Sequence, residues 1–397
     1  MAATAAALVA AATRRDPLLS PDSVDYLSAA DHLHRLGHLT DFTGAPLTIF
    51  QPGYPVLLAA GGRSLGWAAV VGIVSAAVIG WGFVRLLEER VHPSLAIVGG
   101  VVLVASPTLL RVEATVWSEA PYLAIAVLLF VACAAAPSPR RDVGIGVIAG
   151  LGYLTRYAGV SLIVTGLTLI VMATAPAGRR AVCRASARYL VAAIGLGGVW
   201  AARNAIRTGE PLGPRFEGGT RDSVAQVTER TVQTVARVVT GVDLSPGAGT
   251  RVGAVVVAAM LATAAVAVLR SPRRRLDVGM AVFAVCSIAV PMLTRLTSNT
   301  DIEFRVMTPT LVPIVYFSVV GADRLAATRP RSRAMIAAAA VVARPRDGHR
   351  GRFRPRCRDD LDRTPQYAPG LYPVVADLPD DAHVLTNNPQ RVVADRS

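Results

Sequence analysis

Long apolar stretches recur along most of this chain, and few soluble folds can accommodate them. They cover residues 65–87, 93–111, 117–137, 143–156, 158–175, 187–203, 251–270, 277–294 and 304–322, with a shorter one at 334–343. A helix needs about 20 apolar residues to cross a hydrocarbon core of about 30 Å. Only 17% of the residues are charged, whereas about 25% is usual in soluble domains. The pattern predicts an all-α polytopic membrane protein with about ten or eleven transmembrane helices.

Arginine clusters alternate along the chain and predict its orientation in the membrane. The formal net charge is +14, and arginine supplies it because the sequence contains no lysine. The clusters lie at 85–90, 140–141, 179–188, 273–275 and 324–333, as expected for cytoplasmic connections. The loops at 14–54, 111–117, near 156, 203–250 and 295–304 are then predicted to face outward together. Because the arginines are grouped between spans, no nucleic-acid partner is predicted.

The chain divides into three predicted parts. Residues 1–343 form a transmembrane domain, with a first outward loop at 14–54 that carries an amphipathic helix and a large outward loop at 204–250. The apolar N-terminus, 1–13, is too short to span and fits a first helix cut by a late start codon. Residues 344–366 are rich in Arg and Pro, which fits either a shifted reading frame or a disordered basic tail. Residues 367–397 are predicted to be a short extracytoplasmic tail.

Two carboxylates, Asp22 and Asp25, lie at the start of the first outward loop. Charge beside a membrane is costly unless it is used or paired. Taken alone, the spacing favours a helix cap, with Asp22 at the N-cap and Asp25 at the third helical position. The alternative is a general base, since a carboxylate within hydrogen-bond reach can accept a proton from an attacking hydroxyl.

Several further motifs fall on the same predicted face. They are Gln51-Pro52-Gly53-Tyr54-Pro55, Trp117-Ser118-Glu119-Ala120-Pro121, the 150–157 stretch that contains Arg156, and Trp200-Ala201-Ala202-Arg203-Asn204. Together, in this order, they resemble the GT-C membrane glycosyltransferases over roughly residues 20–325. The branch that they resemble most includes the protein mannosyltransferases and aminoarabinose transferases.

The resemblance implies an enzyme that takes a sugar from a polyprenyl-phosphate donor outside the cytoplasmic membrane, usually with inversion. It also implies a first-loop aspartate as general base. In those families the aspartate is followed by glutamate, and an aromatic residue stands four places after the aspartate. Asp22 and Tyr26 match this spacing. Ser23 replaces the glutamate, which leaves Asp25 as the alternative base.

The candidate site residues follow from this chemistry. Phosphate is a good leaving group, so the departing oxygen needs cationic stabilisation, which the planar fork of arginine suits. Glu119 is a candidate to pair an arginine or to hold the acceptor. The candidate catalytic residues are thus Asp22, Asp25 and Glu119; the candidate phosphate ligands are Arg156, Arg203, Arg63 and Arg305, with Arg295 in addition; and the candidate substrate-binding residues are Tyr26, Tyr54 and Asn204. For each arginine, interfacial snorkelling is the alternative. No metal or cofactor is predicted.

The sequence therefore predicts a glycosyltransferase of the bacterial cytoplasmic membrane whose partners are membrane lipid, a polyprenyl-phosphate sugar and an envelope glycan, lipid or protein acceptor. A transporter or flippase for a lipid-linked or polar solute is the alternative. Such a protein would place ionisable groups at mid-membrane, often within inverted repeats. Here the interiors of the predicted spans carry almost no charge, and no internal repeat is visible. An inactive membrane protein is a third interpretation.

Overall fold

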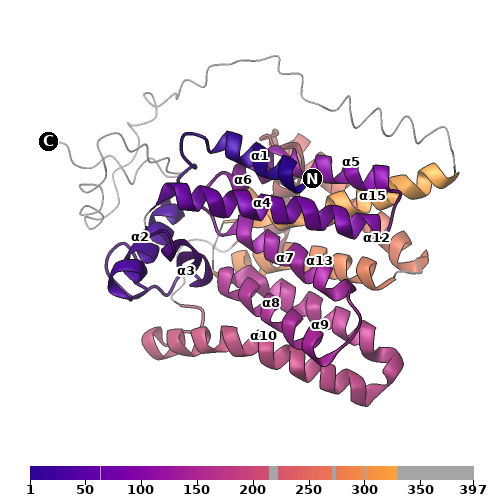
Figure 1. Ribbon diagram of the computed structural model, residues 1–397. Helices are drawn as coiled ribbons and strands as arrows, with labels where there is room; N and C mark the ends of the chain where they lie inside the picture. The colour runs from indigo at the N-terminus through magenta and orange to yellow at the C-terminus, as the bar shows by residue number, and fades with distance from the viewer. Residues whose placement is uncertain (63, 214–221, 271–273, 299–300, 329–397) are drawn as a thin grey trace.

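The computed structural model is all-helical, as predicted, and describes residues 1–62, 64–213, 222–270, 274–298 and 301–328 (Figure 1). Its helices are α1 Ala2–Ala12, α2 Pro21–Leu36, α3 Gly53–Ala59, α4 Leu65–Glu88, α5 Pro93–Val104, α6 Pro107–Glu113, α7 Glu119–Ala134, α8 Pro139–Thr155, α9 Val160–Thr174, α10 Arg179–Thr208, α11 Val224–Thr240, α12 Pro246–Arg270, α13 Arg274–Ser298, α14 Phe304–Met307 and α15 Leu311–Thr328. Short 3-10 turns at Tyr157–Gly159, Ala175–Ala177 and Thr308–Thr310 flank α9 and precede α15. The predicted segments 344–366 and 367–397 and the apolar stretch 334–343 lie outside the described residues.

The protein is a multi-pass membrane protein. In the described ranges, 6 helical segments are long and apolar enough to cross a membrane, or 7 if the bent α5–α6 pair is one span. They are α4, α9 with its flanking turns, α10, α12, α13 and α14 continued by α15. This count is lower than the ten or eleven expected, because α1, α7 and α8 have only 11, 16 and 17 residues and the predicted stretch 334–343 lies outside the described residues.

The stretch at 93–111 is not a straight helix. It divides into α5 and α6, which are bent by 61° relative to each other. Pro107 stands at the first position of α6 and Ser106 is its N-cap residue. Proline cannot donate a backbone hydrogen bond and disfavours helical geometry in the residue before it. The hydropathy of the stretch carries no sign of this break.

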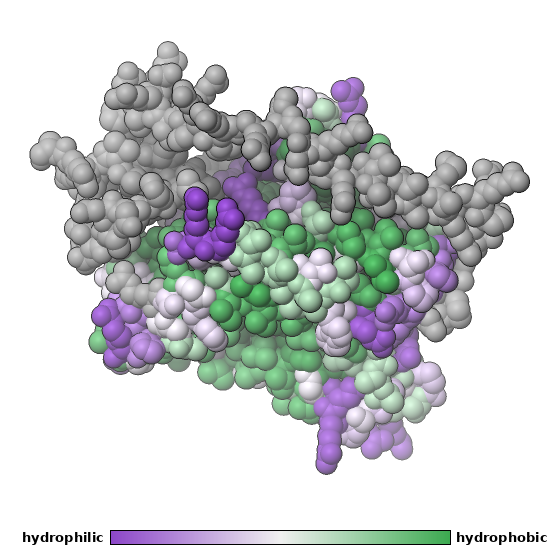
Figure 2. Space-filling view, turned by 45° about the horizontal axis from the view of Figure 1, so that its top comes forward, coloured by the Kyte–Doolittle hydropathy of each residue, from purple (hydrophilic) through white to green (hydrophobic). Residues whose placement is uncertain are grey.

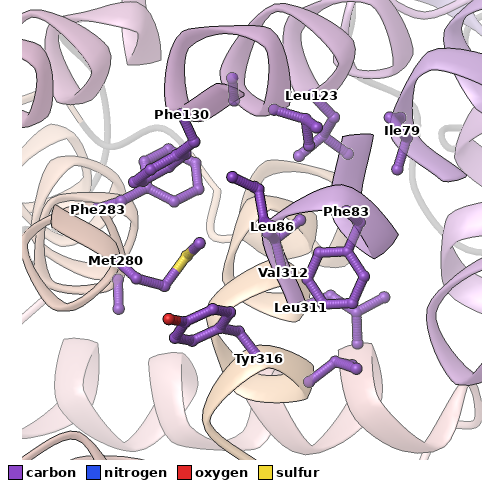
Figure 3. Packing of buried hydrophobic residues seen from close by; sticks show 14 of the residues in the cluster. Ile79, Phe83, Leu86, Leu123, Phe130, Met280, Phe283, Leu311, Val312 and Tyr316 are labelled. Carbon is purple, nitrogen blue, oxygen red and sulfur yellow. The ribbon is translucent and has the colours of Figure 1, made fainter. Parts of the chain in front are cut away.

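The largest of three clusters of buried hydrophobic residues joins α7 to the helices packed around it (Figure 3). Phe130 of α7 meets Phe283 of α13 edge to face, with ring centroids 5.8 Å apart. Phe83 of α4 and Tyr316 of α15 are fully buried in the same cluster. Outside this core, hydrophobic residues form a broad surface across the visible face of the molecule, and hydrophilic residues gather toward its margins (Figure 2).

The two ends of the bundle differ in their charged residues. Helices α2 and α3 lie at one end, on the left of Figure 1. At the far end of the 24-residue α4, Arg90 makes two hydrogen bonds to Asp277, at 3.0 and 2.8 Å, and Tyr316 donates a third at 2.8 Å. Arg188 donates two hydrogen bonds to one oxygen of Asp142, Oδ2, at 3.2 and 2.6 Å. Arginines of the predicted cytoplasmic connections therefore pair there with buried carboxylates.

Small residues let α8 and α10 approach closely. A Cβ atom added at Gly146 would lie 2.5 Å from the carbonyl oxygen of Tyr189. Gly144, two positions away on the exposed side of α8, has nothing within 4 Å of the equivalent point. The predicted packing role of Gly146 agrees with this geometry.

Gly146→Leu is therefore expected to destabilise the protein by about 1–3 kcal/mol, because the added side chain must push α10 away. The thermal unfolding midpoint in detergent measures this effect. Gly144→Leu is the matched control and is expected to leave the midpoint nearly unchanged. Equal midpoints for the two variants would contradict the close α8–α10 contact.

Candidate active site

Helix α2 begins at a serine cap and not at the aspartate that the spacing favoured. Ser20 is the N-cap residue, and its side chain and that of Ser23 satisfy each other's backbone N–H groups as a capping box. Ser23 also donates to the carbonyl of Val116 at 2.9 Å, and the Trp117 indole donates to Ser20 Oγ at 2.7 Å. The interpretation of Asp22 and Asp25 as a capping pair is thus wrong. Since serines perform the capping, the Asp22 carboxylate is available for another role.

Asp22 forms an ion pair with an arginine 283 positions further along the chain. Arg305 Nη1 lies 2.5 Å from Asp22 Oδ2, and Arg305 Nε donates to Glu303 at 2.6 Å. The guanidinium carbon of Arg305 also lies 5.3 Å from the ring centroid of Trp117. One arginine is therefore shared by two carboxylates and held over an indole ring, which fixes its position.

A second ion pair lies next to the first. Arg156 Nη1 is 2.5 Å from Glu119 Oε1 and donates to Ser118 Oγ at 3.0 Å. Ser118 Oγ is in turn 3.2 Å from the hydroxyl of Tyr26. Glu119 is 1% exposed, so its charge is tolerated only because an arginine neutralises it. Arg156 stands in extended conformation where α8 ends, which turns its side chain out of the helix register.

Both arginines and Asp22 line one cavity of about 200 Å³. Its polar wall also includes Gln51, Ser118, Thr155, Thr294 and Asp301. Its apolar wall includes Ile49, Phe50, Val290, Pro291 and Val306. Two carboxylates, of Asp22 and Asp301, and two guanidinium groups thus face a space that is also partly hydrophobic. Such a space suits a ligand with a phosphate group and an apolar part.

Two tyrosines support this cavity differently. Tyr26 lines it, and its ring meets those of Phe50 and Tyr54 edge to face, each at 5.0 Å. Tyr54 is 2% exposed and lies in the layer behind. Burial, with added repulsion from Asp22 and Glu119, raises the pKa of Tyr26, and burial likewise raises the pKa of Tyr54. Both side chains therefore remain neutral phenols that can donate hydrogen bonds.

The remaining candidates do not line the cavity. Arg203 donates to the carbonyl of Leu47 at 2.7 Å and to the amide oxygen of Asn204 at 2.8 Å. Asn204 is fully buried and donates to the carbonyl of Thr48 at 3.3 Å. These two residues fasten the first loop to the end of α10. Asp25 is half-buried and is not a lining residue. Arg63 lies outside the described residues.

Gln51 is a cavity residue to which the sequence analysis gave no role. Its side chain is 3% exposed, and neither of its amide atoms has a hydrogen-bond partner within the described protein. An unpaired buried amide costs about 1–3 kcal/mol. The only signal in the sequence is its place at the head of the Gln51–Pro55 motif.

An ionic cluster connects α11 to the cavity edge. Arg295 pairs with Asp222 at 2.7 Å and with the cavity residue Asp301 at 2.8 Å. Arg230 of α11 pairs with the same Asp222 at 2.9 Å. Thr234 of α11 also donates to the carbonyl of Ile302 at 3.2 Å. In the ranges that the structure covers, no group of three or more His, Cys, Asp or Glu residues is placed to hold a metal ion.

The ion pairs of Asp222 with Arg295 and Arg230, which hold α11 in place, are expected to be lost only in acid. Hydrogen bonding from Arg295 lowers the pKa of Asp222. A depressed folded-state pKa contributes stability above the ordinary carboxyl pKa of about 4, and this stability is lost as pH falls through the lower folded value. Hydrogen exchange of α11 amides, corrected for intrinsic rates, should be constant from about pH 5 to 8 and rise below about pH 4. Asp222→Asn should show faster exchange already at neutral pH. Equal protection of the two proteins at pH 7 would contradict the anchor.

The helices of this protein have the overall arrangement of the solved ArnT structures. Two solved structures of ArnT from Cupriavidus metallidurans, one bound to undecaprenyl phosphate and one in the apo state, match with TM-scores of 0.58 and 0.57. Each match is 15% identical in sequence and covers 86% of this chain and 62% of the ArnT chain. No family profile and no curated protein matches this sequence.

The match confirms the fold that the ordered motifs predicted. This chain spans about three fifths of the length of the solved ArnT chain, 62%. The likeness is one of fold.

Proposed function

We propose that this protein is a glycosyltransferase of the bacterial cytoplasmic membrane, which moves a hexosyl or pentosyl group from a polyprenyl-phosphate donor to an acceptor of the cell envelope on the extracytoplasmic face. The observation that carries the proposal is the meeting of Asp22, Arg156 and Arg305 at one cavity. The solved ArnT structure with undecaprenyl phosphate supports the lipid class of the donor.

In the proposed reaction, Asp22 takes the proton of the acceptor hydroxyl while its oxygen attacks the anomeric carbon. The new carbon–oxygen bond forms as the bond to the phosphate oxygen breaks, and the electron pair leaves with the polyprenyl phosphate. Attack from the side opposite the phosphate inverts the anomeric centre. Arg156 and Arg305 would stabilise the charge on the departing phosphate.

The ion pair between Arg305 and Asp22 fits this scheme. Arg305 is already shared by Asp22 and Glu303. A phosphate that enters the cavity competes for the same guanidinium group, because arginine binds phosphate with two parallel hydrogen bonds. Donor binding would thereby loosen the hold on the Asp22 carboxylate and leave it free to accept a proton.

The cavity walls provide for the other parts of the donor. Val290 and Pro291 belong to α13, one of the segments long and apolar enough to cross the membrane, so an isoprenoid chain could lie against them. The unpaired amide of Gln51 would gain hydrogen bonds from sugar hydroxyl groups. Recognition of the sugar is therefore assigned to the wall that Gln51 shares with Tyr26.

The proposal is tested by incubating the purified protein with a radiolabelled polyprenyl-phosphate sugar and an envelope extract. The expected result is release of polyprenyl phosphate together with label in an envelope acceptor. The protein reconstituted in vesicles forms a second arm of the test. Flux of a solute or lipid-linked sugar into the vesicles without donor consumption would overturn the proposal and favour a transporter.

A further inference from the structure

A second pocket, of about 190 Å³, opens beside Phe304 between α6, α11 and α14. Its charged lining residues are Arg111, Arg237 and Asp243. Arg111 of α6 and Arg237 of α11 belong to segments that the arginine pattern assigns to the outward side, and the structure places both on one aromatic ring. The mechanism proposed for the first cavity uses none of these residues.

Two guanidinium groups converge on the Phe304 ring. The guanidinium carbon of Arg111 is 4.8 Å from the ring centroid, and that of Arg237 is 4.7 Å from it. Phe304 itself is 9% exposed. An arginine that merely snorkels to water has no need of such a ring contact. Here two arginines from different helices are held in place on the same buried side chain.

The pocket carries an excess of positive charge. Arg237 Nε lies 2.8 Å from Asp243, whose side chain is 73% exposed. Arg111 is exposed and has no carboxylate partner within the described part of the chain. Two cations close to one ring repel each other, and a single solvated carboxylate offsets this only in part. A bound anion would relieve the repulsion.

The backbone around the pocket is closely fitted. Helix α11 ends at Gly241, which has a positive φ of +74°. A Cβ atom there would lie 3.0 Å from the Cβ of Pro107. The close approach of α11 to α6 therefore needs glycine, and it is this approach that places Arg237 opposite Arg111.

We propose that the pocket formed by Arg111, Arg237 and Phe304 binds a phosphate group, separately from the donor cavity. Two arginine side chains present paired N–H donors with the planar geometry that phosphate oxygens accept. The phosphate can belong to an anionic lipid headgroup of the outer leaflet or to a free phosphate ion. This site does not depend on the proposed glycosyl transfer.

An anion bound at this site would also affect the first cavity, through the position of Arg305. Phe304 precedes Arg305 in the chain, and its ring lies 6.0 Å from that of Trp117, over which Arg305 is held. An anion bound to Arg111 and Arg237 would pin Phe304, and through it the position of Arg305. This effect on Arg305 bears on the reaction only through the proposed function, whereas the binding of phosphate does not rest on it.

The test is a binding measurement on the full chain. In one arm, ³¹P NMR of inorganic phosphate is recorded with the protein in detergent. In the other, native mass spectrometry counts phosphatidylglycerol retained from nanodiscs of phosphatidylglycerol and phosphatidylcholine. The variants are Arg111→Gln and Arg237→Gln. The matched control is Arg251→Gln, an exposed arginine at the start of α12. Thermal unfolding midpoints establish that each variant is folded.

We expect binding in at least one arm to weaken by about tenfold or more in both Arg111→Gln and Arg237→Gln, and to change less than about twofold in Arg251→Gln. Loss confined to the nanodisc arm identifies a lipid headgroup, and loss in the phosphate arm identifies a free anion; both support the site. Two results would overturn the proposal. One is that a folded Arg111→Gln or Arg237→Gln variant binds as well as the wild type and Arg251→Gln do. The other is no binding in either arm.

Discussion

Asp22→Asn is expected to reduce sugar transfer by about 10²–10⁴-fold, because asparagine cannot accept the proton of the acceptor hydroxyl. The substitution keeps the size of the side chain and its place in the first turn of α2. The Ser20–Ser23 capping box is untouched, so the helix should remain folded. The rate of release of polyprenyl phosphate from the labelled donor measures the effect.

Asp25→Asn is the matched control for this prediction. Asp25 lies in the same helix but does not line the cavity, so its variant should transfer sugar at close to the wild-type rate. Full activity in Asp22→Asn together with loss of activity in Asp25→Asn would identify Asp25 as the general base in place of Asp22. Such an outcome would leave the donor class intact and would reject the assignment of Asp22.

Arg305→Gln is expected to reduce transfer by about 10²–10³-fold, since a cationic donor to the leaving phosphate is lost. It should also raise the KM for the donor, because phosphate binding in the ground state weakens as well. Arg305→Lys should recover part of the rate through its charge, without the two parallel hydrogen bonds of arginine.

The control for this series is Arg207→Gln, which removes an exposed arginine near the end of α10. It is expected to leave both kcat and KM near their wild-type values. If Arg207→Gln lowered transfer as much as Arg305→Gln, a general loss of positive charge on the outward face would explain both results, and a specific role of Arg305 would be rejected.

The sequence predicted the class of fold because apolar length and arginine alternation are local signals. It also named Asp22, Arg156 and Arg305, since their motifs stood at predicted outward ends of spans. The Asp22–Arg305 contact joins residues 283 positions apart. Periodicity and spacing carry no information about such a pairing. The sequence therefore named candidate residues for the cavity but did not predict which of them are in contact.

Other features depended on competition between local signals. Ser20 and Asp22 both suit an N-cap, and the structure selects Ser20 because its side chain also receives the Trp117 indole N–H. Arg203 and Asn204 appeared as site residues because polar groups at the end of a span are costly without a partner. Their partners are backbone carbonyls of the first loop, at Leu47 and Thr48, which sequence motifs do not record.

The most direct test of the central claim is a structure of the wild-type protein with a bound non-hydrolysable polyprenyl-phosphate sugar. We expect the phosphate within hydrogen-bond distance of Arg156 and Arg305, and the anomeric carbon facing Asp22 with room for an acceptor oxygen between them. A phosphate bound away from this cavity, with the Asp22–Arg305 ion pair unchanged, would contradict it.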